Sequence, residues 1–254
     1  MKAAVFVKRH PICCFCGWQT PATTIDHQPA RIIFPNKLRP KGLEFPACSI
    51  CNEQTAPDEA LLALICRAAG SHRPNARQDF QRLKGLVGTI ERRFPGLLKK
   101  MGVTKVWVKN RGVLVSMGAI DVNQHQIELS FCRIAAKLAL AIYYETKSRA
   151  APVGCLINTQ WAHNQNVGAG QHVQNMIGLI PTAATLRAGR WRTDDTFFIK
   201  HYSEAGHLFT GAIFHQAVAL IAHLIEPRIK KTADWEDWQL VMTPVPGKGI
   251  IEAH

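Results

Sequence analysis

The sequence predicts an α+β protein, and three observations support that prediction. Cysteines gather in short-spaced pairs near the start of the chain. Apolar residues then recur with the period of helices. Beyond residue 150, short apolar runs alternate with turn-forming residues, as in strands. Of the 254 residues, 47% are hydrophobic and 19% charged, an ordinary globular balance that argues against disorder.

The first part of the chain is expected to be strand-forming. Residues 13–52 are rich in Cys, Pro and turn formers. Two short apolar runs, residues 31–34 and 43–45, suit short strands joined by the Pro- and Lys-rich loop of residues 35–42.

Three helices are expected after it. The first begins near Thr55, which can cap it, and Gly70 can end it. Residues 75–94 form a second helix, decorated with Arg and Lys. Residues 124–147 give the strongest helical period in the chain.

Strands are expected in the remainder. Residues 103–108 and 113–117 flank a turn at residues 110–112, which is a hairpin signal. Further short strands are expected at residues 155–158, 197–201 and 208–213. Because of Pro244, Pro246 and Gly247, the tail is expected to be loose.

The net charge of +13 indicates a polyanionic partner, most simply nucleic acid. The charge is concentrated, since residues 61–118 carry 12 Lys or Arg and only 2 Asp or Glu. This stretch can follow phosphates through contacts that do not read bases. DNA is the expected partner and RNA is not excluded. The alternatives are a solvated basic helix face and a charge that only aids solubility.

The cysteines predict a metal site. Cys13 and Cys16 form one C-x2-C pair, and Cys48 and Cys51 form a second. Two such pairs can close a tetrahedral thiolate site around a structural zinc ion. Cys14 could be a ligand in place of Cys13. The alternative to a zinc site is a cluster of reduced cysteines that binds no metal.

The setting of the cysteines favours metal over disulfides. No secretion signal is evident, so a cytoplasmic location is expected. Cys66, Cys132 and Cys155 stand alone in apolar surroundings and are expected to be inert core residues. No membrane partner is expected, because histidines interrupt the longest apolar stretch, residues 208–225.

Three polar residues lie next to the two cysteine pairs in the sequence. Asp26 and His27 lie between the pairs, and Asn52 follows the second directly. The pattern C-x2-C … D-H … C-x2-C-N resembles the zinc-containing branch of the HNH nucleases, and its order is close to that of phage endonuclease VII-type enzymes. The resemblance covers about residues 11–65.

The resemblance implies a ββα-metal fold in which zinc is structural, a hairpin carries Asp26 and His27, and a helix carries Asn52. It makes Asp26 and Asn52 ligands of one catalytic Mg²⁺ or Mn²⁺ ion and His27 the general base. Such oxygen ligands suit a hard divalent ion, and an imidazole can take a proton from water near neutral pH. The implied reaction hydrolyses a DNA phosphodiester to a 5′ phosphate and a 3′ hydroxyl.

The sequence departs from the family letters in two places. Asn52 stands where many members have His, although endonuclease VII-type members use Asn there. The middle Asn that steadies the base is not evident; Glu44 lies near its expected place and Asn36 farther off. Glu53 and Glu59 are either auxiliary acids or acids that favour a helix start.

Three segments follow from this reading: a nuclease module at residues 1–70, a basic helix plus hairpin at 71–118 that can hold DNA, and an α+β region at 119–254 of unassigned role. Two other functions stay open, a non-catalytic zinc module that binds nucleic acid and a zinc-folded scaffold for protein interaction. A homodimer also stays open. Histidines at 163, 201, 207, 215 and 223 read better as packed side chains than as a second metal site.

Overall fold

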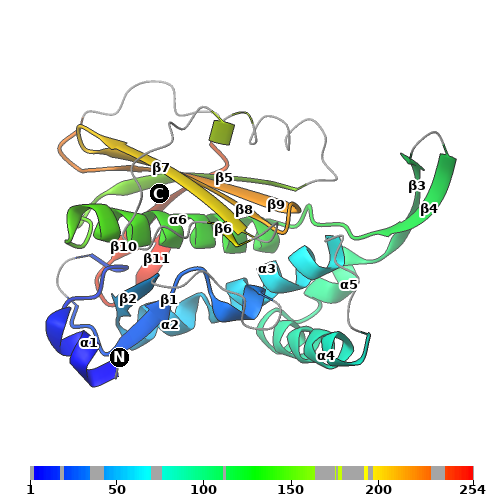
Figure 1. The fold of residues 1–254 in the computed structure, drawn as a ribbon, viewed down its shortest axis with the longest axis horizontal. Coiled ribbons are helices and arrows are strands. Elements are labelled where there is room, and N and C mark those ends of the chain that lie inside the picture. Colours follow the sequence, from blue (N-terminus) through cyan, green and yellow to red (C-terminus); the bar gives the residue numbers. More distant parts are fainter. Residues whose placement is uncertain are drawn as a thin grey trace.

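The computed structural model has three layers (Figure 1). A broad antiparallel sheet forms one outer layer, the helix α6 lies beneath it, and an N-terminal unit of short strands and helices lies on the other side of α6. The structure describes residues 3–17, 20–34, 43–69, 76–110, 113–163, 175, 177–178, 192–193, 197–229 and 238–253. The mixture of helices and strands confirms the predicted α+β class.

The large sheet has seven described strands, all paired antiparallel, in the order β11-β10-β5-β9-β8-β7-β6. Their bounds are β5 Leu156–His163, β6 Arg192–Thr193, β7 Phe197–Glu204, β8 His207–Phe214, β9 Val218–Ile225, β10 Leu240–Val245 and β11 Gly249–Glu252. The strands predicted near residues 155, 197 and 208 are confirmed, each somewhat longer than expected.

The predicted loose tail is wrong. Residues 240–252 form the β10–β11 hairpin, with Val245 opposite Gly249. Pro244 lies within β10, whereas Pro246 and Gly247 form the tight turn, in which Gly247 adopts a φ of 72° and the Lys248 amide donates to the Val245 carbonyl at 3.0 Å. Turn-forming residues therefore marked the connection between strands and not the end of structure.

Helix α6, His125–Lys147, confirms the predicted helix at residues 124–147. Its residues are buried on several sides, because it packs against β5 and β9 of the sheet on one side and against the N-terminal unit on the other. Because α6 has apolar residues on the faces that meet both layers, its sequence shows a strong helical period.

The N-terminal unit begins with helix α1, Ala3–Arg9, which the sequence did not predict. Strand β1, Thr24–His27, then pairs antiparallel with β2, Glu44–Ala47. Two helices follow, α2 at Ser49–Gln54 and α3 at Ala56–Ala69, and the latter confirms the helix expected from Thr55. Figure 1 labels β1, β2 and α2 close together in this unit.

The strand predicted at residues 31–34 is wrong, because Arg31–Ile33 form a 3₁₀ helix, η1. An apolar run this short does not distinguish strand from helix. The carbonyls of this segment are bound by side chains in place of a neighbouring strand: Arg67 donates to Ile32 at 3.1 Å, and His215 donates to Ile33 at 2.9 Å.

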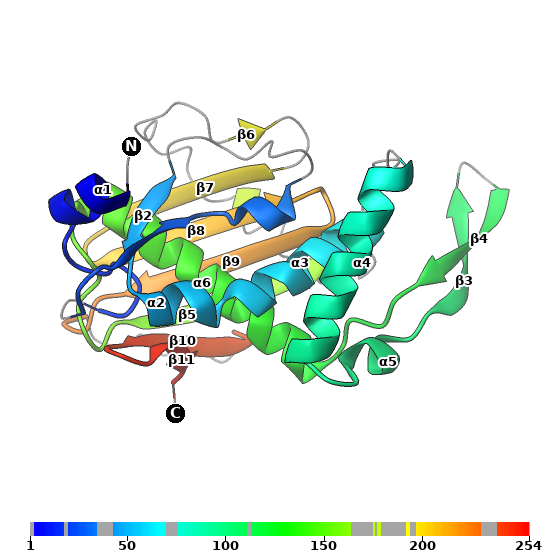
Figure 2. The same cartoon turned by 90° about the horizontal axis from the view of Figure 1, so that it is seen from below.

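After α3, the basic segment forms two helices and a hairpin. Helix α4, Ala76–Arg93, packs on α3 and is followed by α5, Leu97–Met101. The hairpin of β3, Thr104–Asn110, and β4, Val113–Ala119, extends away from the body as an arm (Figure 2). These elements confirm the predicted helix and hairpin.

One buried cluster extends from Cys13 in the N-terminal unit through α3 and α6 to Ile250 in β11. The three predicted segments therefore share a hydrophobic core among their described residues. Within those residues, no helix is both long and apolar enough to cross a membrane.

Candidate functional site

The four paired cysteines converge at the start of the N-terminal unit. The Sγ atoms of Cys13, Cys16, Cys48 and Cys51 all lie within 4.8 Å of one another, and all four residues are buried. The first pair comes from the loop before β1. Cys48 caps helix α2, and its sulfur accepts the Cys51 amide at 3.4 Å. Four thiols gathered this closely can bind a structural metal such as zinc.

The charges of the thiols also favour a metal. Hydrogen bonds from Cys13 and Cys51 lower the pKa of Cys16. The same hydrogen bond to Cys16, with burial, raises the pKa of Cys13 to about 12. The neighbouring thiols therefore shift each other's pKa in opposite directions. A divalent ion removes this conflict, because it stabilises all four sulfurs as thiolates.

The other cysteines lie outside the cluster. Cys14 follows Cys13 directly but is not among the four converging residues, and burial raises its pKa well above the ordinary value. Burial likewise raises the pKa of Cys132 and of Cys155 to about 12 each. Protonated, enclosed thiols are unreactive, as the sequence predicted for these two.

Asp26 lies on β1 and is only 4% exposed. Its Oδ2 atom forms an ion pair with Lys137 Nζ at 2.5 Å, and its Oδ1 atom accepts a hydrogen bond from Gln28 Nε2 at 3.3 Å. Both carboxylate oxygens of this predicted metal ligand therefore have protein partners.

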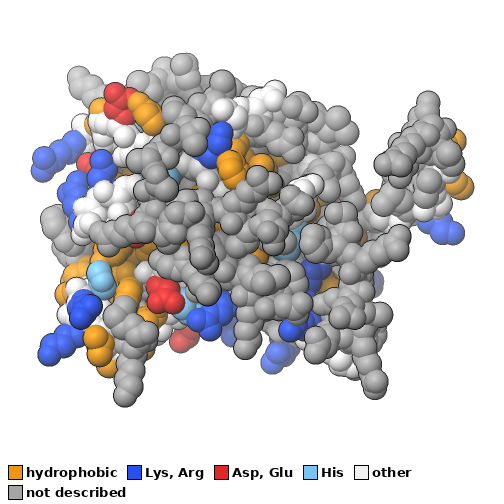
Figure 3. Space-filling model, in the orientation of Figure 1, with side chains coloured by type: hydrophobic (Ala, Val, Ile, Leu, Met, Phe, Trp, Pro, Cys, Tyr) orange, Lys and Arg blue, Asp and Glu red, His pale blue; other side chains and the backbone are white. Residues whose placement is uncertain are grey.

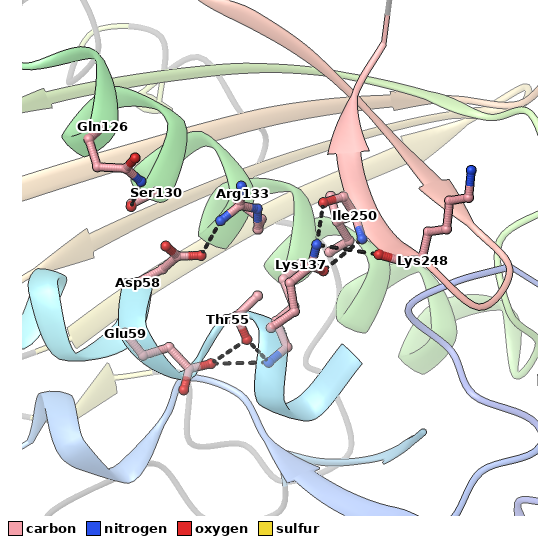
Figure 4. A network of polar contacts seen from close by, with 10 residues as sticks. Thr55, Asp58, Glu59, Gln126, Ser130, Arg133, Lys137, Lys248 and Ile250 are labelled. Carbon is pink, nitrogen blue, oxygen red and sulfur yellow. Dashed lines mark hydrogen bonds and ion pairs between the residues drawn. The ribbon is translucent and has the colours of Figure 1, made fainter. Parts of the chain in front are cut away.

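Lys137 lies on the face of α6 that meets the N-terminal unit and is fully buried. Besides Asp26, its ammonium donates to Glu59 Oε1 at 3.1 Å and to the Thr55 hydroxyl (Figure 4). The ammonium nitrogen also lies 5.3 Å from the ring centroid of Phe15, which stands between the cysteines of the first pair. One side chain thus joins α6 to the cysteine loop, β1 and α3.

The electrostatics of this group are set by two acids and one base. Burial lowers the pKa of Lys137, but the carboxylates of Glu59 and Asp26 outweigh it, so the pKa lies above the ordinary value. Burial raises the pKa of Glu59, and the nearby Asp26 charge adds to the effect. Lys137 is therefore held in its charged form.

A second ion pair lies one turn earlier on α6. Arg133 contacts Asp58 Oδ2 at 2.7 Å, and the side chain of Asp58 is 1% exposed (Figure 4). Arg133 and Lys137 are four residues apart and face the adjacent acids Asp58 and Glu59 of α3. Glu59, which the sequence left as either an auxiliary acid or a helix-start acid, lies in the first turn of α3 and is also paired with α6.

His27 lies at the end of β1, directly opposite Glu44 in the register of β2. Its Nδ1 atom is 3.6 Å from Glu44 Oε1, and its Nε2 atom is 2.8 Å from an Arg31 guanidinium nitrogen. Because arginine can only donate, Nε2 accepts, which places the imidazole proton on Nδ1 beside the carboxylate. The side chain is 26% exposed.

Asn52 lies on α2 and is half-buried. Its amide donates to the Thr24 hydroxyl of β1 at 3.4 Å. Thr24 and Asp26 are two residues apart on the strand and so share a face, whereas His27 points to the other face. The structure thus brings Asp26 and Asn52 to the same side of β1 and directs His27 away from them.

The arrangement fits a structural zinc but does not fit a divalent ion on Asp26 while Lys137 is in place. A divalent ion on Asp26 Oδ2 would lie next to the Lys137 ammonium, and repulsion between two cations is strong in a buried site. Glu53 is exposed on α2, and Glu59 is bound to Lys137.

Sequence reasoning missed Lys137, Arg133 and Arg31. The first two had a signal in the sequence: they are the only charged residues in the central, largely apolar stretch 130–144 of helix α6, four residues apart on one face. A charge in such a position requires a buried partner. Arg31 carried no signal, because its contact depends on the η1 turn.

The histidines of the sheet are packed as predicted. His207 and His223 contact each other at 3.0 Å, and His215 donates to Ile33. Among the residues that the structure describes, the four cysteines are the only group of metal-binding side chains.

Comparison of the chain with models of protein families, with curated proteins and with solved structures found no match.

Proposed function

We propose that this protein is a zinc-stapled phosphodiesterase that acts on nucleic acid, an HNH-type endonuclease in which His27 is the general base. The observation that carries the proposal is the β1–β2–α2 unit closed by four cysteines, with an accessible histidine at the end of β1. The order of these parts is the one that the sequence resemblance implies.

Glu44 supports the role of His27. A carboxylate beside Nδ1 fixes the tautomer and leaves Nε2 to take a proton, as in other histidine bases. Glu44 therefore does the work that the family gives to its middle Asn, and the cross-strand register explains how a residue 17 positions away reaches His27.

Arg31 supports the assignment of a phosphate substrate. It is exposed and its guanidinium lies against Nε2 of His27. A guanidinium binds phosphate oxygens through paired donors. A phosphodiester that draws Arg31 to itself frees Nε2 and places the phosphate beside the base.

The basic group of α4, α5 and the arm is the proposed nucleic-acid surface. Arg92 and Arg93 end α4, and Lys99 and Lys100 end α5, all four exposed. On the arm Trp107 is 70% exposed, which suits stacking on a base. In Figure 3 basic side chains are visible below the sheet and on the arm.

The test is cleavage of supercoiled plasmid DNA and of single-stranded RNA by zinc-loaded protein, with Mg²⁺, with Mn²⁺ and without either. Because general base catalysis contributes at least about 10²-fold, we expect His27→Ala to lower the cleavage rate by that factor. His125→Ala, at an exposed histidine at the start of α6, is the matched control and should cleave like the wild type. No cleavage by the wild type under any condition would refute the proposal.

A second function is favoured by the ion pair between Asp26 and Lys137, which closes the predicted metal ligand from solvent. It is a non-catalytic zinc module that binds nucleic acid. For the same substrates this function predicts no cleavage, and it predicts salt-sensitive binding in a mobility-shift assay that is unchanged in His27→Ala and lost in Cys48→Ala.

A further inference from the structure

Three oxygen atoms from separate parts of the N-terminal unit converge on one point. Asp26 Oδ2 of β1 lies 2.5 Å from that point, and Glu59 Oε1 of α3 lies 3.1 Å from it. The Thr55 hydroxyl, between α2 and α3, completes the set. All three residues are buried, so the oxygens form an enclosed cluster.

The point is occupied by the Nζ atom of Lys137. An ammonium has three N–H donors, and the cluster offers three acceptors, so each donor has a partner. Carboxylate and hydroxyl oxygens are also the ligands of hard divalent ions. The same cluster can therefore hold an ammonium or a divalent ion, but not both.

The protein holds the ammonium firmly in the cluster. The Lys137 side chain is 1% exposed, and its ammonium lies over the ring of Phe15. An entering ion would need to expel a buried lysine and leave its charge without a carboxylate partner, which is strongly unfavourable.

We propose that Lys137 is a built-in cation that takes the place of a divalent ion on Asp26, and that removing it opens a divalent-ion site formed by Asp26, Glu59 and Thr55. Lys137 is in this sense a positioning residue, since it fixes β1 and the acids without reaching the surface. The proposal concerns the site of the proposed function but does not depend on cleavage.

The experiment is a titration of zinc-loaded protein with Mn²⁺, in which free Mn²⁺ is counted by electron paramagnetic resonance. We expect the wild type to bind no Mn²⁺ that depends on Asp26. Lys137→Ala should bind one Mn²⁺ with a dissociation constant below about 1 mM. The double variant Lys137→Ala, Asp26→Asn should lose that ion again.

Arg133→Ala is the matched control. It removes a cation from the same face of α6, but it leaves only the single carboxylate of Asp58 behind. We expect it to bind no additional Mn²⁺, because one carboxylate is a poor site. Mn²⁺ binding by Arg133→Ala equal to that of Lys137→Ala would contradict the specific role of the three-oxygen cluster.

Lys137→Ala exposes two buried acids to each other and can fail to fold. Its thermal unfolding and circular dichroism are therefore recorded with and without Mn²⁺, and the ion should raise its unfolding midpoint or restore its helices. The proposal is overturned if the wild type binds Mn²⁺ through Asp26, or if no divalent ion binds to or restores Lys137→Ala. Loss of cleavage in His27→Ala bears on the proposed function alone, so the two failures are distinguishable.

Discussion

A single histidine in the sheet shows how packing sets a proton affinity. His223 of β9 stacks on Phe209 with ring centroids 3.8 Å apart and contacts His207. Burial, with the neighbouring histidine, lowers the pKa of His223 to about 4 from 6.5. The folded protein therefore keeps this ring neutral in a range where the unfolded chain binds a proton.

This difference predicts a loss of stability in acid. Between pH 6.5 and pH 4 the unfolded state takes up a proton at His223 that the native state refuses, so the free energy of unfolding falls as the pH falls. We expect His223→Gln to reduce this fall by on the order of 1 kcal/mol between pH 7 and pH 5, after allowance for partial exposure. Urea unfolding at several pH values measures it.

The control for this prediction is His125→Gln, at the exposed start of α6 with 69% of the side chain accessible. It should keep the wild-type dependence of stability on pH. Equal slopes for wild type and His223→Gln would show that His223 is not the group responsible.

At the scale of elements, α2 is fastened to the C-terminal strand β11 by one amide side chain. Gln54 donates to the Ile250 carbonyl at 3.0 Å and accepts the Ile250 amide at 2.9 Å. The side chain thus acts like one more residue of the sheet edge. It holds the helix that carries Cys51 and Asn52 against a strand nearly 200 positions later.

Gly249 makes this attachment possible. Its φ is 80°, and a Cβ atom there would overlap the Gln54 Oε1 atom. Gly249→Ala should therefore add backbone strain of about 1 kcal/mol and break two hydrogen bonds of about 1 kcal/mol each, a total destabilisation of about 3 kcal/mol. Gly247→Ala is the control, since its φ is 72° but no atom lies within 4 Å of the added carbon.

Chemical unfolding of the two variants separates strain from overlap. Gly247→Ala should lose only the strain contribution. Equal losses in both variants would mean that Gln54 moves aside at no cost and that the attachment of α2 to β11 contributes little.

The elements also show what a sequence can predict. Helices α3, α4 and α6 were predictable because their apolar period is local. The four-cysteine cluster was predictable because its spacing is itself the signal of the site. The pairing of Lys137 with Asp26 was not, because it joins residues 111 positions apart, and no local pattern names the partner of a buried charge.

At the scale of the whole molecule, α6 connects the sheet with the N-terminal unit. Its apolar residues belong to a single cluster that includes the paired cysteines and the sheet. Loss of the metal should therefore disturb more than the cysteine loops, because the N-terminal unit and the sheet share the burial of α6.

Replacement of adjacent cysteines tests this connection. Cys13→Ala should lose the bound zinc and several kcal/mol of stability, because a structural metal contributes folding free energy directly. Cys14→Ala, equally buried but outside the cluster, should keep the zinc and lose about 1 kcal/mol. Metal content is measured by mass spectrometry, and unfolding by far-ultraviolet circular dichroism and tryptophan fluorescence.

The two optical signals should change together in Cys13→Ala. Separate transitions for the two signals would show that parts of the chain unfold independently of one another. Zinc retained by Cys13→Ala and lost by Cys14→Ala would reverse the assignment of the ligand.

The buried Lys137 on α6 limits how the N-terminal unit can be transferred to another protein. A zinc module can be moved between proteins as a unit only when it carries every side-chain partner that its buried charges need. Residues 1–70 of this chain would leave Lys137 behind, so Asp26 and Glu59 would enter a new host with no base to neutralise them. A gene fusion that transfers the N-terminal unit must therefore also transfer α6. We expect the unit and this helix to be functional only together.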